Sequence, residues 1–144
     1  MRKVLSSLHS EIQKKKITVT NTLTASLSIR GIQAYVYSVF YNVMSNSVKY
    51  SDEKKLSHIN ISYLQTSDTV QIIFSDNGIG FDAESQREKI FKPFSRLNSK
   101  GEGKGLGLYL VKIEMDSMNG TVGIQSQVDA GTTVTLTFRQ GSVT

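Results

Sequence analysis

Residues 39–51 read VFYNVMSNSVKYS, and this stretch decides the fold. It closes a helical pattern between residues 31 and 50, in which the apolar residues fall within about 100° of one another around the helix axis. This stripe consists of Ile32, Val36, Val39, Phe40 and Val43. Three polar residues lie beside the stripe, within roughly 60° of one another. They are Asn42, Asn46 and Lys49, so the pattern predicts a core-facing helix with a polar edge.

Shorter elements precede and follow this helix. Val4, Leu5, Leu8 and Ile12 recur at helical spacing, which predicts a helix over residues 3–14. A strand is predicted at 17–20, before the long helix, and an antiparallel pair of strands at 59–64 and 70–74 after it. Residues 84–104 are predicted to form a mobile loop with short helical turns. A helix at 105–118 that stops at Asn119 and Gly120 and a closing hairpin of strands at 121–127 and 132–138 complete the chain.

Helices and antiparallel strands that do not alternate regularly predict an α/β two-layer sandwich. We expect a mixed, largely antiparallel sheet covered on one face by about three helices. The other face would meet solvent or a neighbouring domain. A chain of 144 residues has the length of one domain, so residues 1–144 are expected to fold as a single unit.

Composition excludes several classes of protein. An apolar fraction of 38% is typical of soluble globular proteins, and the lack of cysteine excludes disulfides and thiolate metal sites. No apolar run approaches the roughly 20 residues that cross a bilayer, so we expect a cytoplasmic domain without direct membrane insertion. A membrane anchor elsewhere in a parent protein stays open. The net charge of +5 favours an anionic partner without identifying it.

Three constellations carry candidate chemistry. The amides of Asn42 and Asn46 and the ammonium of Lys49 suit a metal ion and anionic oxygens, although a solvated helix flank has the same composition. The motif DNGIG at residues 76–80 combines a carboxylate, which can accept a hydrogen bond from the amine of a base, with glycines that let the backbone approach a flat ligand. A tight turn that needs glycine would have the same sequence. The glycines of GEGKGLG at residues 101–107 lead into a helix, where free amide groups suit phosphates, although a flexible hinge would read similarly.

Together and in this order, these pieces resemble the histidine-kinase branch of the superfamily that also contains gyrase and heat-shock chaperone ATPases. The asparagine box reads YNVMSNSVKYS, the first glycine box DNGIGF, the phenylalanine box IFKPFSR and the second glycine box GKGLGL. The closing stretch from Tyr109 to Phe138 is similar to the family's last helix and hairpin. The resemblance therefore spans nearly the whole chain.

The resemblance implies ATP and Mg²⁺ as ligands and assigns roles by position. Asn46 would coordinate the metal, Asp76 would bind the adenine amino group, and Thr132 would support the base through water. Asn42, Lys49 and Arg96 would act in catalysis near the phosphates. The remaining implied nucleotide-binding residues are Tyr50, Gly78, Gly80, Phe91, Phe94, Gly103, Lys104, Gly105, Leu106, Gly107 and Leu108.

Asn42 distinguishes between ATP hydrolysis and phosphoryl transfer. ATP-hydrolysing relatives place a glutamate there as the water-activating base, and an amide cannot take a proton from water at neutral pH. Transfer to an imidazole needs no such base. The resemblance thus implies a protein-histidine kinase of two-component signalling, whose partners would be a separate dimerisation domain and the receiver domain of a response regulator.

The phosphate-accepting histidine is not found in this chain. Its two histidines, His9 and His58, lie outside the family's acceptor context and are expected to be ordinary structural or surface residues. A nucleotide-sensing module without phosphotransfer is the alternative. A nucleic-acid binder would need clustered basic residues interleaved with aromatic ones on one surface, which the sequence does not show.

Overall fold

The computed structural model describes residues 1–92 and 107–140. Within these residues the elements follow in the order α1 (Arg2–Ser7), α2 (His9–Lys14), β1 (Thr18–Asn21), α3 (Gln33–Lys49), β2 (His58–Gln65), β3 (Thr69–Asp76), α4 (Gly107–Ser117), β4 (Thr121–Gln127) and β5 (Gly131–Arg139).

The five strands form one sheet in the order β1-β2-β3-β5-β4. Only β1 pairs in parallel, with β2, and the other neighbours are antiparallel. The predicted mixed, largely antiparallel sheet is therefore confirmed. The pairs predicted at 59–64 with 70–74 and at 121–127 with 132–138 are present as β2 with β3 and β4 with β5.

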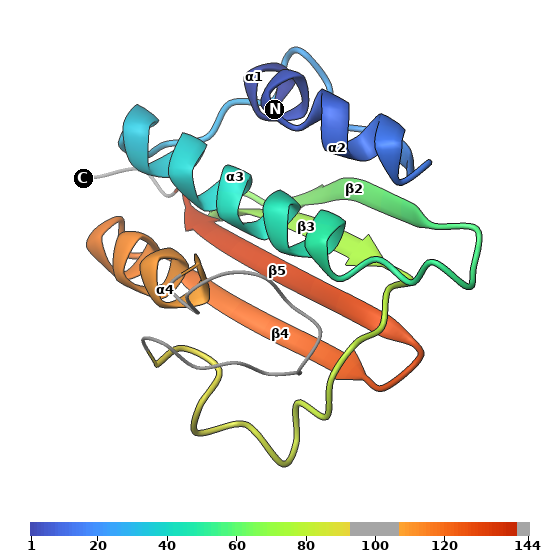
Figure 1. Cartoon of the computed structure of the whole chain (residues 1–144). Helices are drawn as coiled ribbons and strands as arrows, with labels where there is room; N and C mark the ends of the chain where they lie inside the picture. The colour runs from blue at the N-terminus through green and yellow to red at the C-terminus, as the bar shows by residue number, and fades with distance from the viewer. Residues whose placement is uncertain (93–106, 141–144) are drawn as a thin grey trace.

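The helices lie on one face of the sheet, as Figure 1 shows, and the core fills the space between the two layers. At its centre Phe40 of α3 meets the rings of Phe74 and Phe138 edge to face, with ring centroids 5.7 and 6.2 Å apart. Side chains alternate along β3, where Val70, Ile72 and Phe74 are buried, because successive residues of a strand point to opposite faces. The two-layer architecture predicted from the sequence is thereby confirmed.

The first predicted helix differs in detail, because it is interrupted at Leu8. The N–H of Leu8 bonds both to the carbonyl of Val4 at 3.2 Å and to that of Leu5 at 3.3 Å, which tightens the turn between α1 and α2. The N–H of Ile12 still bonds to the carbonyl of Leu8 at 2.9 Å, so the helical segment bends at Leu8 and continues beyond it. Leu8 itself is buried, and the bend lets both short helices follow the core.

The apolar stripe of the long helix was predicted to begin too near its N-terminus. Ile32 precedes α3 with an extended backbone and is 50% exposed, whereas Val39, Phe40 and Val43 are buried as predicted. Met44 and Val48 extend the buried face towards the C-terminal end, as described for the core cluster.

Two helix ends are tied down by polar contacts. The Lys15 ammonium donates to the carbonyls of Val48 at 3.0 Å and Lys49 at 3.2 Å, and a cation at this position stabilises the free carbonyls that end α3. At the end of α4, Asn119 adopts a left-handed backbone and the N–H of Gly120 bonds to the carbonyl of Met115 at 2.9 Å. The stop predicted at Asn119 and Gly120 is confirmed.

Candidate functional site

The centre of the site is the carboxylate of Asp76, the last residue of β3. Its Oδ1 accepts the N–H of Gly78 at 2.9 Å and the N–H of Thr132 at 3.2 Å. The hydroxyl of Ser47 on α3 also bonds to this carboxylate. Three elements therefore meet at Asp76, namely the long helix, the loop after β3 and the start of β5.

Burial raises the pKa of the Asp76 carboxyl, because desolvation disfavours its charged form. The hydrogen bonds from Gly78, Ser47 and Thr132 act in the opposite direction, since each favours the charged form, and His58 adds a weaker electrostatic effect of the same sign. A carboxylate has about four acceptor sites, so Asp76 retains the capacity to accept a hydrogen bond from a ligand beside the bonds from Gly78, Thr132 and Ser47.

The loop after Asp76 is held against the end of α3 and the β4–β5 hairpin. The N–H of Ile79 bonds to the carbonyl of Tyr50 at 2.9 Å, and the carbonyl of Ile79 accepts the N–H of Asp129 at 2.8 Å. A side chain at Gly78 would place its Cβ only 2.4 Å from the Tyr50 carbonyl oxygen. One at Gly80, whose φ is +63°, would come within 2.0 Å of the Gln127 carbonyl oxygen. Both glycines are thus required by close backbone approach.

The two asparagines of α3 face the start of α4. A Cβ built on Gly107 would lie 3.6 Å from Asn42 Oδ1 and 3.6 Å from both amide atoms of Asn46. Both asparagine side chains are half-buried. Residues separated by about 60 positions in the chain are therefore brought together at a single point, where amide oxygens face the N-terminal end of a helix.

Each asparagine presents a free carbonyl oxygen there. Asn42 Nδ2 donates to the carbonyl of Ser38 at 2.9 Å, which fixes the amide and leaves its Oδ1 unoccupied. The Ser38 hydroxyl in turn donates to Glu114 Oε1 of α4 at 2.7 Å. The side chain of Asn46 has no hydrogen-bond partner among the described residues and is available to a ligand.

Sequence reasoning missed the serines that support these residues. Ser47 bonds to Asp76, Ser126 contacts Thr132 Oγ1 at 2.7 Å, and Ser38 orients Asn42. Ser47 follows Asn46 directly, so its position in the asparagine box was a usable signal. For Ser126, the signal was its place opposite Thr132 across the predicted closing hairpin.

The other predicted site residues differ in how far they are exposed. Lys49 is exposed as the last residue of α3, and Tyr50 after it is half-buried, as are Phe91 and Leu108. The predicted residues Phe94, Arg96, Gly103, Lys104, Gly105 and Leu106 lie outside the described residues, as do residues 93–104 of the mobile loop predicted at 84–104.

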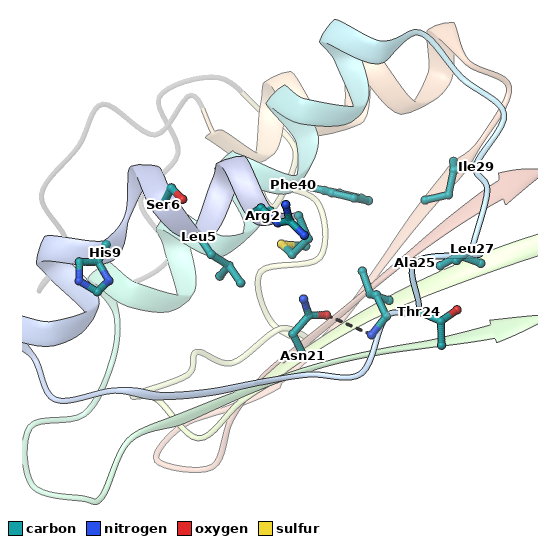
Figure 2. A pocket seen from close by; sticks show the side chains of 12 residues that line it. Arg2, Leu5, Ser6, His9, Asn21, Thr24, Ala25, Leu27, Ile29 and Phe40 are labelled. Atoms are coloured by element: carbon teal, nitrogen blue, oxygen red, sulfur yellow. Dashed lines mark hydrogen bonds between the residues drawn. The ribbon is translucent and has the colours of Figure 1, made fainter.

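Both histidines are exposed in the structure. His58 begins β2, where its backbone N–H bonds to Asn77 Oδ1 at 2.9 Å. His9 begins α2 and lines a separate hollow between α1 and residues 21–29, which Figure 2 shows from close by. None of the residues predicted to bind nucleotide lines that hollow, whose floor is formed by apolar side chains such as Leu5, Leu27 and Phe40.

Two properties of residues 1–92 and 107–140 bear on function. These residues contain no group of three or more His, Cys, Asp or Glu side chains that could hold a metal ion. In the same ranges, no helix combines the length and the apolar character needed to cross a membrane.

Comparison with known proteins places these features in a family. Residues 31–142 match the model of the histidine kinase-, DNA gyrase B- and HSP90-like ATPases. The heme sensor protein HssS of Staphylococcus saprophyticus is 27% identical over 140 residues, covering 97% of this chain and 30% of HssS. The histidine protein kinase SaeS of Staphylococcus aureus is 34% identical over 109 residues, covering 74% of this chain and 31% of SaeS. The chain thus spans about a third of the length of these curated relatives.

Solved structures share the fold. The catalytic domain of histidine kinase ThkA, in a nucleotide-free form, matches with a TM-score of 0.80 at 20% identity, over 98% of this chain and 92% of that one. Full-length ShkA in complex with AMPPNP matches with a TM-score of 0.80 at 20% identity, over 99% of this chain and 30% of ShkA. The chain belongs to the family of histidine kinase-, DNA gyrase B- and HSP90-like ATPases, in the branch of the sensor histidine kinases.

Proposed function

We propose that residues 1–144 form one ATP-binding domain, which binds Mg-ATP and passes its γ-phosphoryl group to a histidine on a separate dimerisation domain. The observation that carries this proposal is the meeting of two half-sites. Asp76 and Thr132 form one half beside the sheet, and Asn42, Asn46 and Gly107 form the other between two helices. Ser47, next to Asn46 in the chain and bonded to Asp76, joins them.

The half beside the sheet suits adenine. Oδ2 of Asp76 accepts from the exocyclic amine, while Gly78 and Gly80 keep the loop close enough to the neighbouring backbone to leave a flat space for the base. A base that carries an acceptor at the same position would meet a carboxylate and be rejected. The solved structure of full-length ShkA, which shares this fold, is a complex with AMPPNP, and this supports a nucleotide as the ligand of the chain.

The half between the helices suits a metal-bound triphosphate. Mg²⁺ takes oxygen ligands and usually keeps several waters, so one or two protein oxygens together with phosphates are sufficient. The free amide oxygen of Asn46 fits that requirement, and Asn42 Oδ1 faces the same point. Magnesium would neutralise charge on the phosphates, while α4 would direct its N-terminal amide groups at them.

Transfer rather than hydrolysis follows from Asn42. Its amide is held by Ser38 with no carboxylate in its place, so nothing at this position takes a proton from water. A neutral imidazole nitrogen attacks without such a base, forming its bond to phosphorus as the β–γ bridging oxygen leaves with ADP. The parent protein would pass the group onward to the receiver domain of a response regulator.

The decisive experiment incubates the chain with γ-labelled ATP and Mg²⁺, with and without the dimerisation domain of the same parent protein. We expect label on the added domain alone and no rapid release of phosphate. Asn46→Ala should abolish labelling, while Asn60→Ala, an exposed asparagine of β2, serves as the matched control. Nucleotide binding without any transfer would support the nucleotide-sensing alternative, and label on His9 or His58 would refute the proposal of a separate acceptor.

A further inference from the structure

The hydroxyl of Ser126 has three neighbours. It lies 3.0 Å from the backbone N of Phe81, 3.0 Å from the carbonyl oxygen of Gly131 and 2.7 Å from Thr132 Oγ1. Ser126 and Thr132 face each other across the β4–β5 hairpin. Because Thr132 N–H also bonds to Asp76 Oδ1, this serine stands directly behind the proposed adenine site.

Counting protons assigns a direction to each of these bonds. The N–H of Phe81 is always a donor and the carbonyl of Gly131 is always an acceptor, while a serine hydroxyl has one proton and two lone pairs. All three contacts are satisfied together only if Ser126 donates to Gly131 and accepts from both Phe81 and Thr132. The single proton of Thr132 is then directed at Ser126, and Thr132 Oγ1 has only lone pairs left for a ligand.

We propose that Ser126 is a specificity-determining positioning residue, which makes Thr132 an obligate acceptor and so strengthens the preference for a 6-aminopurine over a 6-oxopurine. The inference rests on the proposed function, because it concerns the base that the same site would bind. Asp76 Oδ2 and Thr132 Oγ1 would then offer two acceptors, which match the two N–H groups of an adenine amine in direct contact.

A 6-oxopurine such as hypoxanthine carries an acceptor at the same position. It would face two acceptors, and neither could reverse, because Asp76 is a carboxylate and Thr132 has already given its proton to Ser126. Selectivity in this arrangement comes from repulsion of the wrong base as well as from attraction of the right one. Without Ser126, Thr132 could rotate and donate to the oxo group.

The test compares ADP with IDP, which differ only in the base, by calorimetric titration without metal. Wild-type chain should prefer ADP, and Ser126→Ala should reduce the ratio of the two affinities by about three- to tenfold, as expected for one neutral hydrogen bond. Ser75→Ala is the matched control, because Ser75 and Thr133 form a similar serine–threonine contact of 3.2 Å elsewhere on the neighbouring strands. That variant should keep the wild-type ratio.

A ratio that is unchanged in folded Ser126→Ala would overturn the inference, since a merely structural serine would lower both affinities equally. If Ser126→Ala does not fold, Thr132→Val provides the second test, because loss of the acceptor should also lower the ratio. In a variant carrying both changes, no further loss is expected if the two residues act together. A wild-type chain that binds neither nucleotide would instead refute the proposed function.

Discussion

Replacing Asp76 by asparagine should separate the ligand-binding role of this residue from its structural one. Asparagine has nearly the same volume, and its Oδ1 can still accept the N–H groups of Gly78 and Thr132, which lie 2.9 and 3.2 Å from the present oxygen. Its amide nitrogen would then replace Oδ2 and present a donor to the adenine amine, which is also a donor. A hydrogen bond to a charged group is worth about 1.5–3 kcal/mol, so ADP affinity should fall by roughly ten- to more than a hundredfold.

Stability should change far less than affinity. The two backbone bonds become weaker because their acceptor is no longer charged, but the desolvation cost of a buried carboxylate disappears at the same time. Calorimetric titration with ADP and thermal unfolding by circular dichroism would measure the two effects. A folded Asp76→Asn protein that binds ADP as tightly as the wild type would refute the assignment of the adenine site.

Three further predictions follow from the same geometry. Asn46→Ala should weaken Mg-ADP binding more than that of metal-free ADP, and equal losses in titrations with and without Mg²⁺ would remove Asn46 as a metal ligand. Gly131→Ala should destabilise the fold by at least about 2 kcal/mol in urea unfolding. At Gly131 φ is +105°, and the new Cβ would lie 2.0 Å from the Asp76 carbonyl oxygen. A Cβ at Gly123 would meet nothing within 4 Å, so Gly123→Ala serves as the control. Since burial raises the pKa of Asp76, the folded state binds more protons than the unfolded state at pH values just above the ordinary pKa of an aspartate. The stability of the wild type relative to Asp76→Asn should therefore fall as the pH rises through that window. A stability difference that stays constant between pH 4 and pH 7 would contradict this sign.

The fold was predictable because its signals are local and repeat. Alternation at period two identified β2, β3 and β5, and the 3.6-residue period identified α3, since burial on one face imposes these periods directly. The interruption at Leu8 could not be read in this way. It depends on how two short helices follow a core surface that only the tertiary structure defines.

The site was predictable in composition but not in its contacts. The asparagine box and the first glycine box predict which residues belong to the candidate site, yet no periodicity shows that Gly107 lies against Asn42 and Asn46. That approach joins residues distant in sequence and results from packing of α4 beside α3. The supporting serines could not be predicted for a related reason. Serine is a common residue, and its role depends on which acceptor its single hydroxyl proton bonds to in the folded chain.

Ser47 provides the sharpest remaining test of how the two half-sites are joined. It is buried on α3 directly after Asn46, and its hydroxyl bond to Asp76 is one of the contacts that lower the pKa of this carboxyl against the effect of burial. Ser47→Ala should therefore raise the pKa of Asp76 further. Because an ionised carboxylate accepts a hydrogen bond from an amine more strongly than a protonated carboxyl group does, the midpoint of ADP binding against pH should move to higher pH than in the wild type. The phosphates of ADP titrate identically with both proteins, so the shift between the two curves reports Asp76 alone. Coincident curves would mean that Ser47 fills space without controlling the carboxylate, and that the long helix and the adenine site act independently.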